Sequence, residues 1–155
     1  MLNVHQLVCR RGLTTLFDNL DLNLNPGEMI YLKGANGAGK TTLLRTIAGL
    51  STQEAGTVLW DGVNIQSIRE EFTSKIIFIG HAPAVKDDLT VAENLITSLQ
   101  LSGTHTTDDA ITHALSEVGL EKRRSIPTRA LSQGQKKRLD LARLWTEYRP
   151  LWLLD

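Results

Sequence analysis

Residues 34–42 constrain this chain more than any other stretch. They read GANGAGKTT and fit the pattern G-x-x-x-x-G-K-[ST], in which a glycine-rich loop turns successive backbone N–H groups toward phosphate oxygens. In that pattern the lysine, Lys40, reaches the β- and γ-phosphates and the hydroxyl of Thr41 ligates Mg²⁺. A glycine-rich turn can match the pattern by chance, so the flanking segments have to decide between the two interpretations.

The flanking segments favour a nucleotide site. Residues 29–32 are apolar and follow a Pro-Gly turn, which predicts a buried strand. Residues 42–48 carry apolar side chains at helical spacing, and Gly49 is placed to end the helix. This order puts a helix N-terminus, with its positive dipole end, at the phosphates. The predicted ATP-binding residues of the loop are Gly34, Ala35, Asn36, Gly37, Ala38, Gly39, Lys40, Thr41 and Thr42.

Composition limits the partners. The chain has 155 residues, enough for one ordinary domain, and its 17 Lys plus Arg balance 17 Asp plus Glu, so no net field favours nucleic acid. The single cysteine, Cys9, cannot form an internal disulfide and indicates a reducing compartment. No apolar run approaches the roughly 20 residues of a membrane helix, and no signal-peptide core precedes Gly12. We therefore expect a cytoplasmic protein that inserts into no membrane itself.

An antiparallel β layer is predicted on both sides of the loop in the sequence. Residues 20–24 alternate strictly between leucine and polar residues, as a half-buried strand does, and residues 2–8 are a weaker strand candidate. Residues 57–65 contain Asp-Gly between two apolar runs, which predicts a hairpin.

Helices are predicted for the second half of the chain. Thr90 and Glu93 fit a capping box at the start of one helix, and residues 107–118 predict a second that Gly119 closes. A third is expected from 136 to 145, before Pro150. Short apolar runs at 76–79 and 151–154 predict buried parallel strands.

Asp155 follows the last of these strands. Ligands of open α/β sheets bind beyond the carboxyl ends of the strands, and a carboxylate there can hold Mg²⁺ beside a phosphate loop. Asp155 could also be an ordinary strand-end residue. Because the chain already carries a phosphate loop, we expect Thr41 and Asp155 to be the magnesium ligands.

Four motifs in one order resemble the ATP-binding cassette (ABC) ATPases. They are the loop at 34–42, Gly80-His81 after a strand, LSQGQ at 131–135 and LWLLD at 151–155. The resemblance implies an α/β phosphate-loop (P-loop) NTPase core with a parallel sheet, an antiparallel β layer and a helical subdomain, truncated at its C-terminal end. Residues 1–83 and 146–155 would form the ATP-binding core, and 84–145 the helical subdomain with the signature.

More narrowly, the chain is similar to the ATP-binding subunits of the cytochrome c maturation (Ccm) haem exporter. The similarity lies in FIGH at 78–81, in LT at 89–90 with ENL at 93–95, and in LARLW at 141–145 with PLW at 150–152. It implies a head-to-tail dimer with itself or a homologous subunit, docked on integral membrane subunits at the cytoplasmic face of the inner membrane.

In such a dimer the signature residues of one subunit face the ATP of the other. Ser132, Gly134 and Gln135 would take this role, since Ser132 occupies an N-cap position from which its hydroxyl can reach a phosphate. The alternative is that Ser132 is a plain helix cap, and one residue can serve as both. The resemblance implies catalytic roles for Lys40, His81, Ser132 and Asp155.

Three features depart from the family pattern. His81 stands where most members have glutamine, so we expect it to couple or to position water rather than to ligate Mg²⁺, although a structural loop histidine is the alternative. Arg11 falls where many members stack an aromatic ring on adenine; a guanidinium can also stack, and Phe17 is the other candidate. The acidic residue and histidine that complete hydrolysis would follow Asp155, so this chain is expected to bind ATP without turning it over.

Other functions remain open at this stage. The chain could drive a transporter with a different cargo, because no motif contacts cargo. It could be a soluble ABC protein acting on DNA or ribosomes, although Lys40 and Ser132 are too close in sequence for the coiled coil of the DNA-repair types. It could also sense nucleotide without hydrolysing it.

Overall fold

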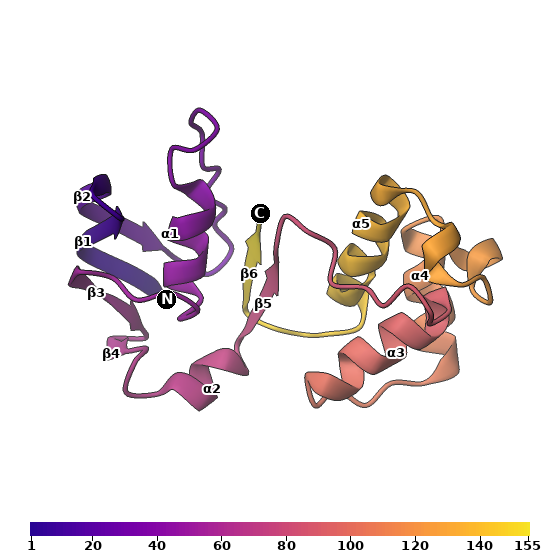
Figure 1. The fold of residues 1–155 in the computed structure, drawn as a ribbon. Helices are drawn as coiled ribbons and strands as arrows, with labels where there is room; N and C mark the ends of the chain where they lie inside the picture. Colours follow the sequence, from indigo (N-terminus) through magenta and orange to yellow (C-terminus); the bar gives the residue numbers. More distant parts are fainter. The chain divides into compact units, whose positions relative to one another are not determined.

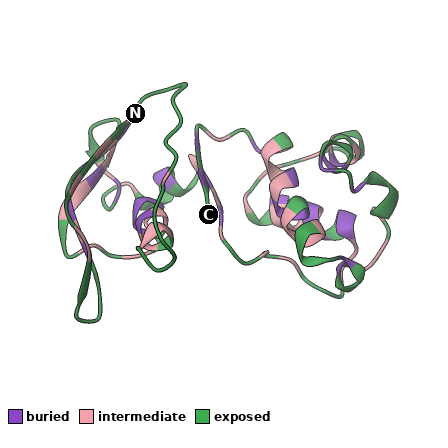
Figure 2. Cartoon of the chain, turned by 90° about the horizontal axis from the view of Figure 1, so that it is seen from above, coloured by how far each residue is buried: buried purple, intermediate pink, exposed green.

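The computed structural model describes all 155 residues and divides them into two compact units. The first unit contains residues 1–78 and 150–155, and the second contains residues 79–149. Figure 1 labels the elements of both units. Buried residues, purple in Figure 2, lie mainly on the strands and helices, whereas most connecting segments are exposed.

An antiparallel sheet forms one part of the first unit. It consists of β1 (Leu2–Arg11), β2 (Thr14–Leu24), β3 (Ala55–Trp60) and β4 (Val63–Asn64), in the order β2-β1-β3-β4. The predicted strands at 2–8 and 20–24 are confirmed, and both are longer than predicted. The leucines of residues 20–24 are half-buried and the polar residues between them are exposed, as their alternation predicted.

The predicted hairpin joins β3 to β4. Asp61 and Gly62 form its turn with φ values of 50° and 83°. Two consecutive positive φ angles belong to a type I′ turn, whose twist matches that of the strands it connects. The Asp-Gly pair thus sets the turn locally.

Helix α1 (Lys40–Ile47) packs its apolar side against this sheet. Leu43 and Ile47 are buried with Val4, Leu7 and Val58 in one core. The predicted helix at 42–48 is confirmed, but it begins at Lys40. A short helix, α2 (Arg69–Thr73), adds Phe72 to the same core.

A separate two-stranded sheet is formed by β5 (Ile76–Ile79) and β6 (Leu151–Leu154). Both predicted strands are present. The prediction that the last strand is fully buried is correct for one face only: Leu151 and Leu153 are buried, whereas Trp152 and Leu154 are about half exposed.

Residues 29–32 do not form the predicted buried strand. They have no regular secondary structure, and Met29 and Tyr31 are 90% and 76% exposed. A strand exists only when a neighbouring strand takes its hydrogen bonds, and here β5 and β6 pair with each other. An apolar run indicates that a segment can be buried, but a strand also needs an adjacent strand to pair with, and the run does not determine whether one is present.

The second unit is helical. It contains α3 (Val91–Leu101), α4 (Asp108–Glu117) and α5 (Gln133–Leu141), with 3₁₀ turns η1 (Glu121–Arg123), η2 (Thr128–Ala130) and η3 (Ala142–Trp145). Its core gathers apolar side chains from all three α-helices, among them Leu95, Leu115 and Leu139.

The helix boundaries follow the capping signals. Thr90 and Glu93 form both hydrogen bonds of the predicted capping box, and Thr107 caps α4. The helix predicted at 136–145 begins earlier, at Gln133, and its α-helical part ends at Leu141 before one 3₁₀ turn. None of the helices is long and apolar enough to span a bilayer.

Candidate nucleotide-binding site

The glycine-rich loop leads directly into α1. Gly37 and Gly39 have φ values of 84° and 95°, a left-handed conformation that side chains disfavour, and Gly39 is the N-cap of α1. A β-carbon on Gly39 would also lie 2.9 Å from the ring of Phe17. Residues 34–38 are exposed, so the loop and the helix N-terminus are open to a ligand.

Lys40 folds back over the loop. Its Nζ donates hydrogen bonds of 2.8 Å to the carbonyl oxygens of Gly34 and of Ala35. These bonds hold the positive charge above the loop instead of leaving it at the end of a free side chain. A phosphate seated on the loop would lie beside a cation that is already positioned.

Thr41 and Asp155 meet although 114 positions separate them in the sequence. The Thr41 hydroxyl lies 3.0 Å from Oδ1 and 2.9 Å from Oδ2 of the Asp155 carboxylate, to which it donates. Hydroxyl and carboxylate oxygens are the donors that Mg²⁺ prefers. No three His, Cys, Asp or Glu side chains gather into a metal cage, so a magnesium ion here would take its other ligands from phosphate and water. The donor set fits Mg²⁺ bound with a nucleotide.

Phe17 and Arg11 occupy different places in the first unit. The Phe17 ring lies against Gly39, at the start of α1. Arg11 is the last residue of β1, exposed and paired with Thr14 across the turn to β2. Of the two candidates for stacking on adenine, Phe17 is the one in contact with the loop.

The signature residues form the start of α5. The Ser132 Oγ accepts from the Gln135 backbone N–H at 3.2 Å, and the Gln135 Oε1 accepts from the Ser132 backbone N–H at 2.9 Å. Ser132 is therefore a helix cap in this chain, and Gly134 lies in the first turn beside it. Ser132 and Gly134 are both exposed.

His81 lies in the second unit, in an exposed segment between β5 and α3. The residue before it, Gly80, accepts a hydrogen bond of 2.5 Å from Lys137 Nζ through its carbonyl oxygen. Ala84 donates its backbone N–H to Asp140 Oδ2 at 2.9 Å. Sequence reasoning missed Lys137 and Asp140; the available signal was a pair of opposite charges three residues apart on one helix.

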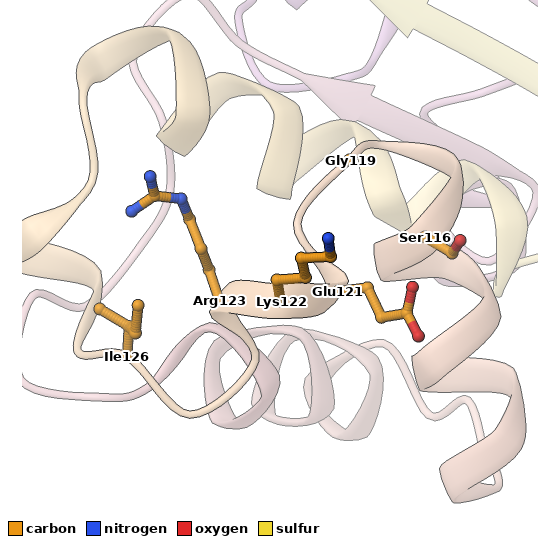
Figure 3. Close-up of a pocket in the computed structure, with 6 residues that line it drawn as sticks. All are labelled: Ser116, Gly119, Glu121, Lys122, Arg123 and Ile126. Atoms are coloured by element: carbon orange, nitrogen blue, oxygen red, sulfur yellow. The ribbon is translucent and has the colours of Figure 1, made fainter.

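One hollow of the second unit contains no predicted site residue. It has a volume of about 590 Å³. Figure 3 shows the residues that line it. Lys122 and Arg123 of η1 line it together with residues at the end of α4. All of its charged side chains are exposed, so this hollow does not resemble a built ligand site.

A glycine-rich loop at the start of a helix, with a threonine hydroxyl against a strand-end carboxylate, defines a phosphate-loop nucleotide-binding protein. The family described as "ABC transporter" matches residues 17–155. The chain therefore belongs to the ABC transporter family and is an ABC-type ATP-binding subunit, as its motifs predicted.

Curated relatives align with the whole chain. The Cytochrome c biogenesis ATP-binding export protein CcmA of Nitrosomonas europaea is 42% identical over all 155 residues, which cover 73% of that protein. The protein of the same name from Dechloromonas aromatica is 44% identical, again over the whole chain and over 76% of the relative. The chain thus spans about three-quarters of the length of these relatives.

Solved structures confirm the α/β fold class. A putative ABC transporter ATP-binding protein from Pyrococcus furiosus superposes with a TM-score of 0.89 at 25% identity, over 99% of this chain and 74% of that one. CbiO1 from Clostridium perfringens, described as part of the ABC transporter complex cbiONQ, gives a TM-score of 0.78 at 25% identity, over 99% of this chain and 64% of that one.

Proposed function

We propose that this chain is the ATP-binding subunit of an exporter that moves haem for cytochrome c biogenesis. The observation that carries the proposal is the whole-chain identity of 42–44% to proteins named for ATP-binding export in that process. The motifs at 78–81, 93–95 and 141–145 are similar to the same subfamily.

The proposed nucleotide site combines the loop with two charges. Residues 34–42 would surround the phosphates, Lys40 would neutralise them, and Thr41 with Asp155 would hold Mg²⁺. Phe17 or Arg11 would contact the adenine. The proposed ATP-binding core is 1–83 with 146–155, and the helical subdomain is 84–145.

The proposed partners are a second ATP-binding subunit and membrane-spanning transporter subunits. In a head-to-tail pair, Ser132, Gly134 and Gln135 would face the ATP of the other subunit, and His81 would respond to nucleotide. The pair would act at the cytoplasmic face of the inner membrane. The start of α5 supports this arrangement, because Ser132 and Gly134 are exposed at a helix N-terminus, which favours phosphate binding.

Members of the family hydrolyse ATP as full-length proteins. We propose that the 155-residue polypeptide binds ATP but does not turn it over. Lys40, Thr41 and Asp155 would hold the phosphate and the metal, yet hydrolysis also requires a group that orients water, whose loss typically costs about 10²- to 10⁴-fold in rate.

Replacing the loop lysine tests the site. Lys40→Ala should weaken ATP binding by about tenfold or more, equivalent to about 1.4 kcal/mol, in a fluorescence or calorimetric titration. Lys33→Ala is the matched control, since Lys33 lies outside the loop and over the Tyr31 ring. Equal affinities for Lys40→Ala and the unaltered chain would contradict the site assignment.

Export function needs a test in cells. A bacterium deprived of its own ATP-binding subunit for cytochrome c biogenesis should regain covalent haem in its c-type cytochromes when it produces this protein in full length. The Lys40→Ala variant should not restore it. If normal ATP binding is accompanied by no recovery of cytochromes, the cargo is a different one.

A further inference from the structure

The segment between β5 and α3 is fastened to α5 at three points, all within the second unit. Lys137 Nζ donates to the Gly80 carbonyl oxygen, and the Ala84 N–H donates to Asp140 Oδ2. Further along the segment, Asp87 pairs with Lys136. Lys136 and Lys137 thus lie four and five residues after Ser132, the cap at which this helix begins, and Asp140 lies eight residues after it.

Asp140 is the buried anchor. It is only 7% exposed, and its carboxylate accepts from a backbone N–H of the segment. Burial raises the pKa of Asp140 above its ordinary value, an effect opposed by the Ala84 hydrogen bond and by the charges of Arg143 and Lys137. A buried carboxylate is costly unless it is bonded, so this contact holds the segment strongly.

The far end of the segment is held by α3. The Asn94 side chain accepts from the Lys86 N–H at 2.7 Å and donates to the Lys86 carbonyl oxygen at 2.9 Å. It also donates to the carbonyl oxygen of Leu89 at 3.2 Å. Residues 80–89 therefore have polar bonds to two helices of the unit and cannot move far without breaking them.

We propose that Lys137 and Asp140 are positioning residues that fasten the His81 segment to the signature helix, so that displacements at His81 and at Ser132 occur together. His81 directly follows the Gly80 carbonyl bonded to Lys137, and Ala84 is three residues further on. That His81 and Ser132 respond to nucleotide rests on the proposed function, whereas the attachment of residues 80–84 to α5 does not.

Hydrogen exchange of the nucleotide-free chain tests the fastening. Asp140→Ala removes the acceptor and should make the Ala84 amide exchange at least tenfold faster. Asp140→Asn keeps an oxygen in the same place and should restore most of the protection. The control is Asp88→Ala, which removes a carboxylate that is 93% exposed in the same segment. Unchanged Ala84 exchange in Asp140→Ala would overturn the proposal.

Lys137→Met gives an independent variant, since it keeps an apolar stem and removes only the ammonium. It should speed exchange at 81–84, and it remains available if Asp140→Ala does not fold. Equal exchange in Lys137→Met and the unaltered chain would contradict a role for Lys137.

Mg-ATP provides the coupled measurement. In the unaltered chain, adding Mg-ATP should change exchange at 80–84 and at 132–135 together, and in Lys137→Met the two responses should separate while ATP affinity is retained. If exchange at 80–84 and at 132–135 still changes together in Lys137→Met, as in the unaltered chain, the proposed coupling is wrong. If the unaltered chain binds no Mg-ATP, the proposed function fails, and the nucleotide-free comparison still decides the fastening.

Discussion

Thr41 and Asp155 show how single residues acquire a role through folding. Each is an ordinary polar residue in its own segment, one at the start of α1 and one just after β6. The structure brings the Thr41 hydroxyl to within 3.0 Å of both carboxylate oxygens. A small hydroxyl and a carboxylate at this separation are a pair of oxygen donors suited to Mg²⁺.

Removing the Thr41 hydroxyl should uncouple metal from nucleotide. Thr41→Val keeps the shape of the side chain but lacks the oxygen, so the gain in ATP affinity that Mg²⁺ provides should fall by about tenfold, or about 1.4 kcal/mol. Titrations with Mg²⁺ and with a chelator would measure it. Thr41→Ser retains the hydroxyl and should behave like the unaltered chain. An undiminished Mg²⁺ effect in Thr41→Val would show that Thr41 is not a ligand.

At the scale of elements, capping explains where α3 begins. The Thr90 Oγ accepts from the Glu93 N–H at 3.2 Å, and the Glu93 carboxylate accepts from the Thr90 N–H at 2.8 Å. Two backbone donors that the helix leaves unpaired are satisfied in this way. The Thr90 backbone N–H and the Thr90 hydroxyl both donate hydrogen bonds to the Glu93 carboxylate, and these bonds lower the pKa of Glu93 below its ordinary value of 4.5.

Because Glu93 is part of the cap, the stability of the helical unit should depend on pH in the acidic range. A carboxyl group with a lowered pKa stabilises the folded state above its ordinary pKa, and this stabilisation is lost as the pH falls from about 4.5 through the lowered pKa. Glu93→Gln keeps the acceptor without the charge. The difference in melting temperature between Glu93→Gln and the unaltered chain should therefore shrink as the pH falls from about 6 to about 3. A constant difference across that range would argue against the ionised cap.

Thr90→Ala tests the other half of the cap. Loss of an N-cap hydroxyl costs about 1 kcal/mol, and urea unfolding of the chain would measure the change. Thr90→Ser, which keeps the hydroxyl, serves as the control and should retain most of the stability. A Thr90→Ala chain as stable as the unaltered one would mean that the cap adds nothing to the fold.

At the scale of the whole molecule, each unit has a core of its own. The first buries residues of β1, β3 and α1, and the second buries the inner faces of α3, α4 and α5. Leu115 is fully buried in the second core, whereas Leu101, at the end of α3, is 85% exposed.

These two leucines give a matched comparison. Leu115→Ala should lower the free energy of unfolding by about 2–5 kcal/mol, because it removes buried methyl groups and leaves a cavity. Leu101→Ala should change it by less than about 0.5 kcal/mol. Urea unfolding combined with hydrogen exchange would show whether the loss is concentrated in residues 79–149, as separate cores require. Equal effects of the two substitutions would contradict the burial of Leu115.

The sequence by itself determined the features that depend on neighbouring residues. The glycine-rich loop, the Asp-Gly turn at 61–62, the capping box at Thr90 and the N-cap position of Ser132 all agree with the structure. Each is set by backbone conformations and hydrogen bonds within a few residues, so its pattern is readable in the chain.

Only the tertiary structure decided what depends on distant partners. It left residues 29–32 without the strand neighbour that their apolar run predicted, and it exposed one face of β6. It also brought Asp155 to Thr41 and buried Asp140 against the Ala84 amide. The physical reason is that sheet pairing and long-range hydrogen bonds are satisfied by whichever group lies opposite in space, and local sequence does not name that group.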